Sequence, residues 1–538
     1  MMRFFRSNSI SSFASIVGLG AILSGLLGLL RYRLLASGLG ASRAFDIYVA
    51  AFRVPDFIYG LLILGSISAT FIPLFTALQS REERNTFISA AFSIIGLGML
   101  ILCALLFISA PFFVTLIVPG FDSEAKRMTV LLTRIMLAQP VLLAISNLLT
   151  NTLQGFNKFV VSALAPSFYN IGIILGILLS VPHLIPGVQP IFGLEGLAYG
   201  VVAGSLLQLA VQLPAFLSLG LSWRPIFRVT SEIKKMFTLM GPRILGVASD
   251  QINVMVITAI ASTLSLGSIT IFSLAQNIQA APMGIIGIAV ATAAFPTLSR
   301  AFSHEKRDEF IGTFIQSFTL ILFFTIPLSL LFILLRAQIV RVILGTGQFG
   351  WDETRLTAAS LGIFGMSLFA QTLLPLVARA YYSMRDTKTP VIIGLIGFVV
   401  NVGLSFLFVH LLSYANPFSH GIAQSLKLQY IFDIRVIGLA LAFSLTVIIE
   451  FLLLFLLLLL HIDAKRIGKL NASWLKIVVS AFTMALATYG ALRPLATLLN
   501  TQTTLGVFLQ GFLAGLFGIG VYLVVTHLLK ENPLTGKH

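Results

Sequence analysis

Residues 436–461 read VIGLALAFSLTVIIEFLLLFLLLLLH and contain a single charged side chain, Glu450. A helix of about 20 apolar residues is long enough to cross the hydrocarbon layer of a membrane, which is about 30 Å thick. This stretch therefore predicts a transmembrane helix. Comparable apolar runs recur from one end of the chain to the other, so the same argument applies to most of the sequence.

The composition of the whole chain agrees with a membrane protein. Of its 538 residues, 57% are hydrophobic and only 10% are charged, whereas a soluble domain carries about 25% charged residues. So few charges cannot cover a surface that faces water, and no hydrophilic stretch is long enough to form a soluble domain. We therefore predict an all-α polytopic membrane protein.

About fourteen transmembrane helices are predicted from the apolar runs. Their approximate limits are residues 9–36, 45–79, 87–117, 127–153, 160–182, 193–219, 234–262, 268–300, 309–336, 354–382, 389–412, 436–461, 473–495 and 503–529. The first helix is expected to be retained and not cleaved as a signal peptide. Its apolar part is longer than a signal-peptide core, and Arg31 and Arg33 follow it directly.

The distribution of Lys and Arg predicts the orientation. The net charge of +16 comes from short basic clusters between the apolar runs. No basic stripe with interleaved aromatic residues is present, so nucleic acid is not an expected partner, whereas membrane lipids are. Most of these clusters lie on the side that holds both termini, which predicts that both termini face the cytoplasm. The predicted location is the inner (cytoplasmic) membrane.

Two stretches of the chain run in parallel, one starting at Gly120 and the other at Gln348. Each gives an acidic turn, a span, a basic or polar turn, and a second span that carries an asparagine, Asn170 or Asn401. Parallel repeats often place a substrate site between the repeated lobes, although chance similarity between apolar helices is the alternative. The repeat predicts two six-helix lobes followed by a C-terminal helix pair, at residues 1–222, 223–465 and 466–538.

Ionisable groups inside spans are costly, so each is a candidate functional residue. The first two predicted helices hold Arg31, Asp46, Arg53 and Asp56. Arg31 and Asp46 lie near a membrane surface, where snorkelling of the side chains is an alternative explanation. Arg53 lies deeper, beside Pro55, and is predicted to contact substrate, with Asp56 three residues later as a structural partner.

Helix 234–262 carries Arg243 and Asp250 seven residues apart, and therefore on one face. Pro242 is expected to interrupt this helix and to free backbone groups for a cavity. Arg243 lies near a helix end, where anchoring to lipid headgroups is the alternative.

Amides and one carboxylate complete the set of candidates. Helix 268–300 holds Gln276, Asn277 and Gln279 just before Pro282, which suggests a water-facing surface, or hydrogen bonding between helices. Glu450 is a candidate proton site or a lipid-facing carboxylate, and the sequence does not decide between them. Guanidinium groups form bidentate bonds to phosphate, so the arginines predict an anionic, phosphate-bearing substrate.

Covalent chemistry is not expected. The chain has no GxxxxGK[ST], HExxH or GxSxG motif, and its seven His residues are scattered near span ends or in loops. The single cysteine, Cys103, excludes an intrachain disulfide and is expected to be a packing residue. We predict no catalytic residues, no cofactor and no metal site.

Several segments resemble one family. The run GLLRYRLLASGLGASRAFDIYVAAFRVPDF at 28–57, GPRILGVASDQIN at 241–253, AAFPTLSRAF at 293–302 and YYSMRDTKTP at 381–390 are similar to motifs of the MurJ/MviN lipid II flippases of the MOP transporter superfamily. The resemblance implies a transporter with a central cationic cavity, alternating access, and an undecaprenyl-pyrophosphate-linked peptidoglycan precursor as substrate. Cell-wall synthesis proteins are candidate partners.

The chain departs from the family pattern at several cationic positions. Ser24-Gly25 stands where the family has a Ser-Arg pair, residues 59–66 replace an arginine-containing segment, and Gln276-Asn277 replace an Asp-Arg pair. Asn401 matches a family cation site, but Ile257 and Ser405 stand where that site has carboxylates. Sodium coupling is therefore not expected.

The resulting hypothesis is a lipid II flippase. The predicted substrate-binding residues are Arg31, Asp46, Arg53, Arg243, Gln276 and Asn277, and the predicted coupling residues are Asn401, Glu450 and Asp250. Asp46 is expected to orient an arginine. Two alternatives remain: a flippase or exporter for another polyprenyl-linked or amphipathic substrate, and a non-transporting membrane scaffold that has lost the arginine site.

Overall fold

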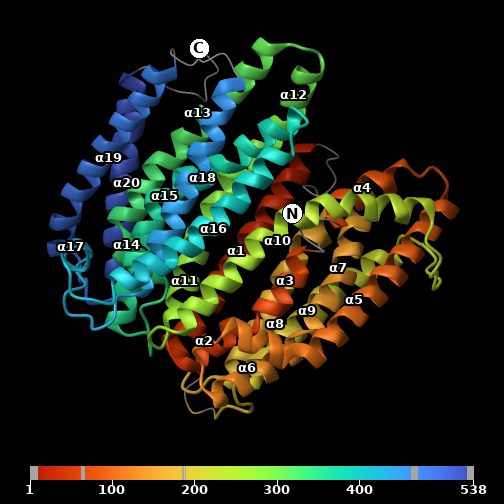
Figure 1. Ribbon diagram of the computed structural model, residues 1–538, viewed down its shortest axis with the longest axis horizontal. Coiled ribbons are helices and arrows are strands. Elements are labelled where there is room, and N and C mark those ends of the chain that lie inside the picture. The colour runs from red at the N-terminus through yellow and green to blue at the C-terminus, as the bar shows by residue number, and fades with distance from the viewer. Residues whose placement is uncertain (1–9, 62–66, 185–186, 188, 462–469, 530–538) are drawn as a thin grey trace. The chain divides into compact units, whose positions relative to one another are not determined.

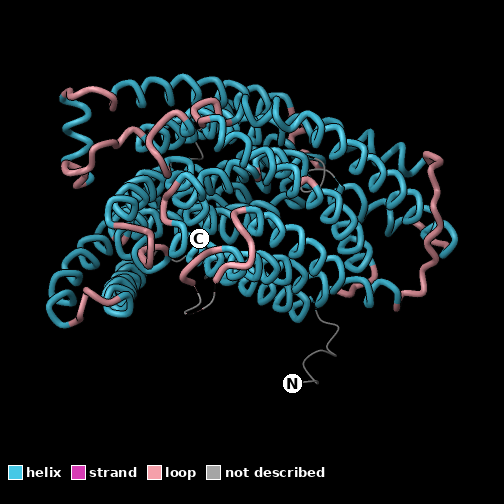
Figure 2. The backbone as a smooth tube through the Cα atoms, turned by 90° about the horizontal axis from the view of Figure 1, so that it is seen from below, coloured by secondary structure: helices cyan, strands magenta, loops and turns pink. Residues whose placement is uncertain are grey.

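The computed structural model describes residues 10–61, 67–184, 187, 189–461 and 470–529. Within these ranges, only the backbone is described for residues 10–17, 68–69, 241–247, 461 and 470–472. All assigned elements in the described part of the chain are helices, joined by loops and turns (Figure 2). The predicted all-α membrane fold is confirmed.

The helices form two compact units, which are coloured along the chain in Figure 1. The first unit spans Met1–Ile269 together with Thr346–Phe349, and the second spans Thr270–Gly345 and Gly350–His538. Helices of the first unit are α1 (Ile10–Leu39), α2 (Arg43–Ala51), α3 (Arg53–Ile58), α4 (Ser68–Ala77), α5 (Arg81–Ile117), α6 (Ser123–Met136), α7 (Ala138–Gly155), α8 (Phe159–Ser180), α9 (Glu195–Leu217) and α10 (Ser231–Ser262).

The second unit contains the remaining helices and one π-helical segment. They are α11 (Ser268–Pro282), η3 (Met283–Ile288), α12 (Ala289–Ser303), α13 (Arg307–Leu334), α14 (Arg336–Ile343), α15 (Trp351–Ser383), α16 (Lys388–Leu411), α17 (Pro417–Leu426), α18 (Val436–His461), α19 (Leu470–Leu498) and α20 (Thr504–Leu528). Helix α10 packs against α3, α4 and α5, and therefore groups with the first unit. The predicted division into lobes at residues 222 and 465 stays a prediction.

Twelve helical stretches within the described residues are long and apolar enough to cross a membrane, and each coincides with a predicted span. The other two predicted spans, 45–79 and 234–262, are not among these twelve. The first is divided into α2, α3 and α4, and the second corresponds to α10. The total of fourteen therefore stays a prediction.

The expectation of one continuous helix over 45–79 is wrong, and Pro55 supplies the physical reason. Proline has no amide hydrogen, so it cannot bond to the carbonyl four residues earlier in a helix. The carbonyl that lacks its helical donor is that of Ala51, where α2 ends. It accepts a hydrogen bond of 3.3 Å from Thr133 Oγ1 of α6 instead. Helix α3 begins immediately after the break, at Arg53.

Helices α8 and α9 approach each other closely because glycines face each other along their contact. A Cβ atom on Gly172 would collide with the backbone of Gly204, and one on Gly200 would lie 2.7 Å from the Cα of Gly176. Small residues spaced four apart allow this backbone approach in membrane proteins, where dispersion replaces the hydrophobic effect as the force between helices. Figure 1 shows these two helices within the first unit.

Aromatic side chains link several helices in the core of the second unit. The Phe318 ring of α13 lies 5.1 Å from that of Phe455 in α18 and 4.8 Å from that of Trp474 in α19. The Tyr381 hydroxyl of α15 donates to the Leu454 carbonyl at 2.9 Å. These contacts join α13, α15, α18 and α19. Helix α19, the first helix of the predicted C-terminal pair, therefore packs into the second unit.

Two turns have the same backbone geometry at corresponding points of the predicted repeat. Asn157, after α7, has φ = 60°, and Arg385, after α15, has φ = 63°. In each turn the next residue donates its amide to a carbonyl five residues earlier, with N–O distances of 2.8 and 3.0 Å. This match is what the repeat requires, although Glu305 after α12 also has a positive φ, and the repeat stays a prediction.

The glycine contact between α8 and α9 predicts the effect of a larger side chain. Gly176→Val should force the two helices apart and reduce the free energy of unfolding by about 1–3 kcal/mol, which is typical of overpacking. Thermal unfolding of the detergent-solubilised protein measures this. Gly98→Val in α5 is the matched control, because a Cβ on Gly98 meets nothing within 4 Å. Equal melting temperatures for the two variants would contradict this account.

Candidate functional site

Arg53 is held in place by a second helix of the first unit. Its Nε donates to Thr258 Oγ1 of α10 at 2.9 Å. The Thr258 hydroxyl donates its own hydrogen to the Val254 carbonyl at 2.7 Å, which leaves the oxygen oriented to accept. The bond to Thr258 uses only Nε, and a guanidinium has four further N–H donors on its terminal nitrogens. Thr258 thus fixes the direction in which those donors point.

Arg31 lies in the same electrostatic environment. Its guanidinium stacks over the Tyr32 ring, 4.6 Å from the ring centroid. The Asp56 carboxylate is close enough to interact with both Arg53 and Arg31. Tyr48 of α2 and Tyr169 of α8 also lie within electrostatic range of Arg31. We call Arg31, Arg53, Asp56, Tyr48 and Tyr169 the cationic cluster.

In the cationic cluster, two guanidinium groups lie within electrostatic range of one carboxylate, that of Asp56. Arg31, Arg53 and Asp56 are all partly buried, so water screens them only partly, and a charge in such a place needs compensation. The grouping of side chains from several helices disfavours snorkelling of Arg31, because a snorkelling side chain extends to the headgroups. Chemically, the cluster suits an anion that accepts hydrogen bonds from guanidinium groups.

Asp46 is almost fully buried, with 1% of its surface exposed. One carboxylate oxygen, Oδ2, accepts a 2.8 Å hydrogen bond from the amide of Gly267, in the loop after α10. Gly267 has φ = +82°, and a Cβ there would collide with the Ala41 carbonyl, so glycine is required. In this conformation Asp46 fastens the end of α10 to α2, and its predicted contact with substrate stays a prediction.

Two further contacts in the first unit involve a glycine and an amide. A Cβ on Gly60 would lie 2.7 Å from Nε2 of Gln251 in α10, so the absence of a side chain admits that amide. On α1, Ser24 accepts bonds of 3.2 Å from Asn170 Nδ2 at both its carbonyl and its hydroxyl oxygen. Asn170, noted in the repeat, therefore connects α8 to α1.

The predicted interruption at Pro242 is wrong. Helix α10 continues from Ser231 to Ser262, starting at the Thr230 side chain, which caps it by accepting from the Ile233 amide. Proline is tolerated here within a long helix at the loss of one backbone bond. The side chain of Arg243 lies outside the described residues. Asp250, two turns further along, is exposed on α10.

The amides of α11 belong to the second unit and have different surroundings. Gln279 is 1% exposed, and its Nε2 donates to Gln371 Oε1 of α15 at 2.5 Å. Gln371 in turn donates to Ser367 Oγ at 2.9 Å. Gln279 is thus part of an interhelical hydrogen-bond chain, not of a water-facing surface. Gln276 is partly buried and Asn277 is exposed, which is compatible with the water-facing surface predicted for these two residues.

The predicted coupling residues Asn401 and Glu450 lie in α16 and α18, which pack together. A Cβ on Gly397 would stand 3.2 Å from Glu450 Oε2, and one on Gly394 would stand 3.8 Å from Oε1. Glu450 therefore faces α16, which disfavours the lipid-facing alternative. Asn401 is buried one turn after Gly397, and its Oδ1 accepts from Ser405 Oγ at 3.4 Å.

Sequence reasoning missed Tyr48, Tyr169, Gln251 and Thr258. Each is a polar side chain within a predicted span. By position within a span, only charged side chains and the amides of α11 are candidates from the sequence, so these four residues are not among them. Their grouping around the arginines depends on helix packing. Within the described ranges, no group of three or more His, Cys, Asp and Glu side chains is placed to hold a metal ion.

Comparison with known proteins identifies relatives along most of the chain. A probable lipid II flippase MurJ from Vibrio cholerae serotype O1 is 30% identical over 419 residues, covering 74% of this chain and 78% of that protein. A probable lipid II flippase MurJ from Rhizobium tropici is 28% identical over 398 residues, covering 73% of this chain and 74% of that protein.

Solved structures give the same result for the fold. A structure of the lipid II flippase MurJ in an inward closed conformation is 25% identical, with a TM-score of 0.73, covering 95% of this chain and 98% of that one. An inward-facing multidrug resistance transporter of the MATE family, also in the MOP superfamily, shares the fold at 16% identity, with a TM-score of 0.62. The family model for the lipid II flippase MurJ matches residues 35–505. The chain belongs to the MurJ family of lipid II flippases, a family of multi-pass inner-membrane transporters.

Proposed function

We propose that this protein moves lipid II across the inner membrane by alternating access, with the cationic cluster as part of the substrate site. The single observation that carries this proposal is the guanidinium of Arg53, held by Thr258, with Asp56 within electrostatic range of both Arg53 and Arg31. The membership of the chain in the MurJ family supports the same substrate. No covalent step is needed, because transport changes only the side from which the site is accessible.

The chemistry of a polyprenyl diphosphate fits this cluster. Each phosphate offers several acceptor oxygens, and arginine binds them through parallel N–H bonds while remaining charged. Asp56, within electrostatic range of both guanidinium groups, balances part of their charge before the substrate arrives. The polar headgroup needs such a site because the hydrocarbon layer solvates it poorly, whereas the polyprenyl tail can stay in the lipid throughout.

The finer assignments belong to the same proposal. Both termini face the cytoplasm, as the basic clusters predict. The substrate carries an undecaprenyl-pyrophosphate group, and cell-wall synthesis proteins receive or supply it. Arg243, Asp46, Gln276 and Asn277 are further substrate contacts, among which the two amides supply donors without charge.

The departures from the family pattern leave fewer arginines to bind the diphosphate. Ser24 bonds to Asn170, and Gly60 contacts Gln251, at two of the places where the family carries arginine-containing segments. Ser24 and Gly60 therefore serve helix packing in this chain, whereas Gly25, which stands in place of the arginine of the Ser-Arg pair, has nothing within 4 Å of a Cβ built on it. We infer that Arg31 and Arg53 carry a larger share of diphosphate binding than they would in a site with more arginines.

Two alternatives stay open. A flippase or exporter for another polyprenyl-linked or amphipathic substrate would use the same cluster with a different headgroup. The smaller number of arginines favours a non-transporting scaffold. The Arg53–Thr258 bond forms without substrate, so this bond is compatible with the lipid II flippase and with both alternatives. Binding measurements separate them.

Arg53→Ala should weaken binding of lipid II and of undecaprenyl diphosphate at least about tenfold, since hydrogen bonds to charged groups contribute roughly 1.5–3 kcal/mol each. Native mass spectrometry of the purified protein measures binding, and proteoliposomes with fluorescent lipid II measure transport. Thr258→Val keeps the charge but removes its anchor, so a smaller loss is expected.

Arg134→Ala is the matched control, because its Nε also donates a hydrogen bond within the first unit, here to the Phe107 carbonyl at 3.0 Å, and Arg134 is not part of the cationic cluster. It should bind lipid II as the wild type does. Lipid II binding that is unchanged in Arg53→Ala would rule out the cluster as the diphosphate site. Transport of a different polyprenyl lipid alone would favour the exporter, and no binding of either lipid by the wild type would favour the scaffold.

We also propose Glu450 as the coupling carboxylate, on the evidence of its position against Gly394 and Gly397 of α16. If it exchanges a proton during transport, Glu450→Gln should abolish the response of lipid II transport to an imposed pH difference across proteoliposomes. Glu195→Gln, at the start of α9, is the control and should keep that response. A response that survives in Glu450→Gln would exclude this role.

A further inference from the structure

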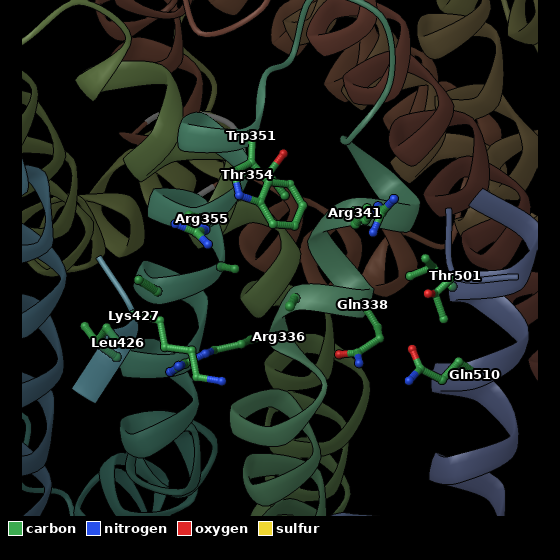
Figure 3. A pocket seen from close by; sticks show the side chains of 14 residues that line it. Arg336, Gln338, Arg341, Trp351, Thr354, Arg355, Leu426, Lys427, Thr501 and Gln510 are labelled. Atoms are coloured by element: carbon green, nitrogen blue, oxygen red, sulfur yellow. The ribbon is translucent and has the colours of Figure 1, made fainter. Parts of the chain in front are cut away.

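A pocket lies in the second unit and is formed entirely by residues of that unit. It has a volume of about 240 Å³. Its lining comes from α14, α15, the end of α17, the loop before α20, and α20 itself. The lining residues used below are Arg336, Gln338, Arg341, Trp351, Arg355 and Lys427 (Figure 3).

All the segments around the pocket are connections between spans or the ends of spans. Helix α14 follows the span α13, Trp351 begins α15, α17 connects α16 to α18, and the last wall is the connection between α19 and α20. All of these connections lie at the end of α13 that is marked by Leu334, and not at the end where α13 begins with Arg307. The pocket therefore lies at one boundary between membrane and water, where Trp side chains are common.

Four side chains in the pocket carry a positive charge: Arg336, Arg341, Arg355 and Lys427. The lining contains no Asp or Glu, and none of the four makes an ion pair in the part of the chain that the structure describes. Arg341 and Arg355 lie over the Trp351 ring, 5.7 and 5.2 Å from its centroid. The uncompensated charge predicts an anionic ligand.

Two features of the backbone lie beside these cations. Lys427 ends α17 with φ = +59°, a left-handed conformation that is unusual for a residue with a long side chain. Gly362 of α15 leaves room for Arg336, since a Cβ there would stand 3.0 Å from Nη1 of that guanidinium. In Figure 3 the Arg336 side chain extends toward Lys427.

A neutral acceptor completes the pocket. The amide oxygen of Gln338 is buried and has no hydrogen-bond partner, and a buried polar atom in this state costs free energy. A hydroxyl group on the ligand, such as that of a glycerol or a sugar, would satisfy it. The lining also includes Ala337, Leu426 and Val507, which present apolar surface to the remainder of a headgroup.

We propose that this pocket binds the phosphate group of a membrane lipid, separately from the transport site. Guanidinium and ammonium groups are the usual partners of phosphate. The volume is smaller than the roughly 300–1,000 Å³ of sites that enclose drug-sized molecules. It therefore suits a headgroup whose acyl or polyprenyl chains remain in the bilayer. An anionic phospholipid and a polyprenyl diphosphate share this chemistry and are the two sources to be distinguished.

Native mass spectrometry of the full-length protein with phosphatidylglycerol, undecaprenyl diphosphate or phosphatidylcholine tests the proposal. Arg355→Gln and Lys427→Gly should each weaken binding of an anionic lipid about tenfold, which corresponds to the loss of one charge-assisted contact. Lys427→Gly relieves the left-handed strain, so its melting temperature should not fall. A loss of binding in this variant is then not a loss of folding.

Arg385→Gly is the matched control. It also replaces a cation at a left-handed position after a helix, with φ = 63°, but Arg385 does not line the pocket. It should bind each lipid as the wild type does. The lipid whose binding depends on Lys427 and Arg355 identifies the source. Wild-type binding by both pocket variants, or equal binding of phosphatidylcholine, would overturn the proposal.

Discussion

A charged group inside an apolar helix has to find its partners within the protein, and this constraint organises the first unit. Arg53 bonds to Thr258, Asp46 bonds to the amide of Gly267, and both partners come from α10 or the loop that follows it. Helix α10 is thereby fastened at two points to the segments α2 and α3. The same contacts that satisfy these charges place α10 with the first unit.

The break between α2 and α3 follows from this arrangement and contributes to it. Pro55 frees the Ala51 carbonyl, which Thr133 of α6 then satisfies. Arg53 consequently begins a new short helix, and its side chain need not follow the direction that a continuous helix would impose. Close glycine contacts have a complementary role elsewhere: they bring α8 against α9, with Tyr169 of α8 near Arg31.

We propose that positive charge serves different purposes in the two units. In the first unit, Arg31 and Arg53 interact with Asp56 and are anchored by neighbouring side chains, which suits a site that must hold a diphosphate and release it again. In the second unit, four cations line a pocket at the membrane boundary without a carboxylate among them. Such a pocket suits a lipid that stays bound, because no carboxylate in its lining competes for the cations.

The sequence by itself determined the membrane fold, the positions of twelve spans and the family. These depend on local composition, on run length and on short motifs, all of which are contiguous in the chain. It also identified Arg31, Arg53 and Asp56 as unusual, because charges in apolar runs stand out. Only the tertiary structure decided that Thr258, Tyr48 and Tyr169 surround the arginines, that Gln279 bonds to Gln371, and that Glu450 faces α16. The physical reason is that helix packing brings together residues more than two hundred positions apart, as Arg53 and Thr258 show, and a single sequence carries no local signal for such pairs.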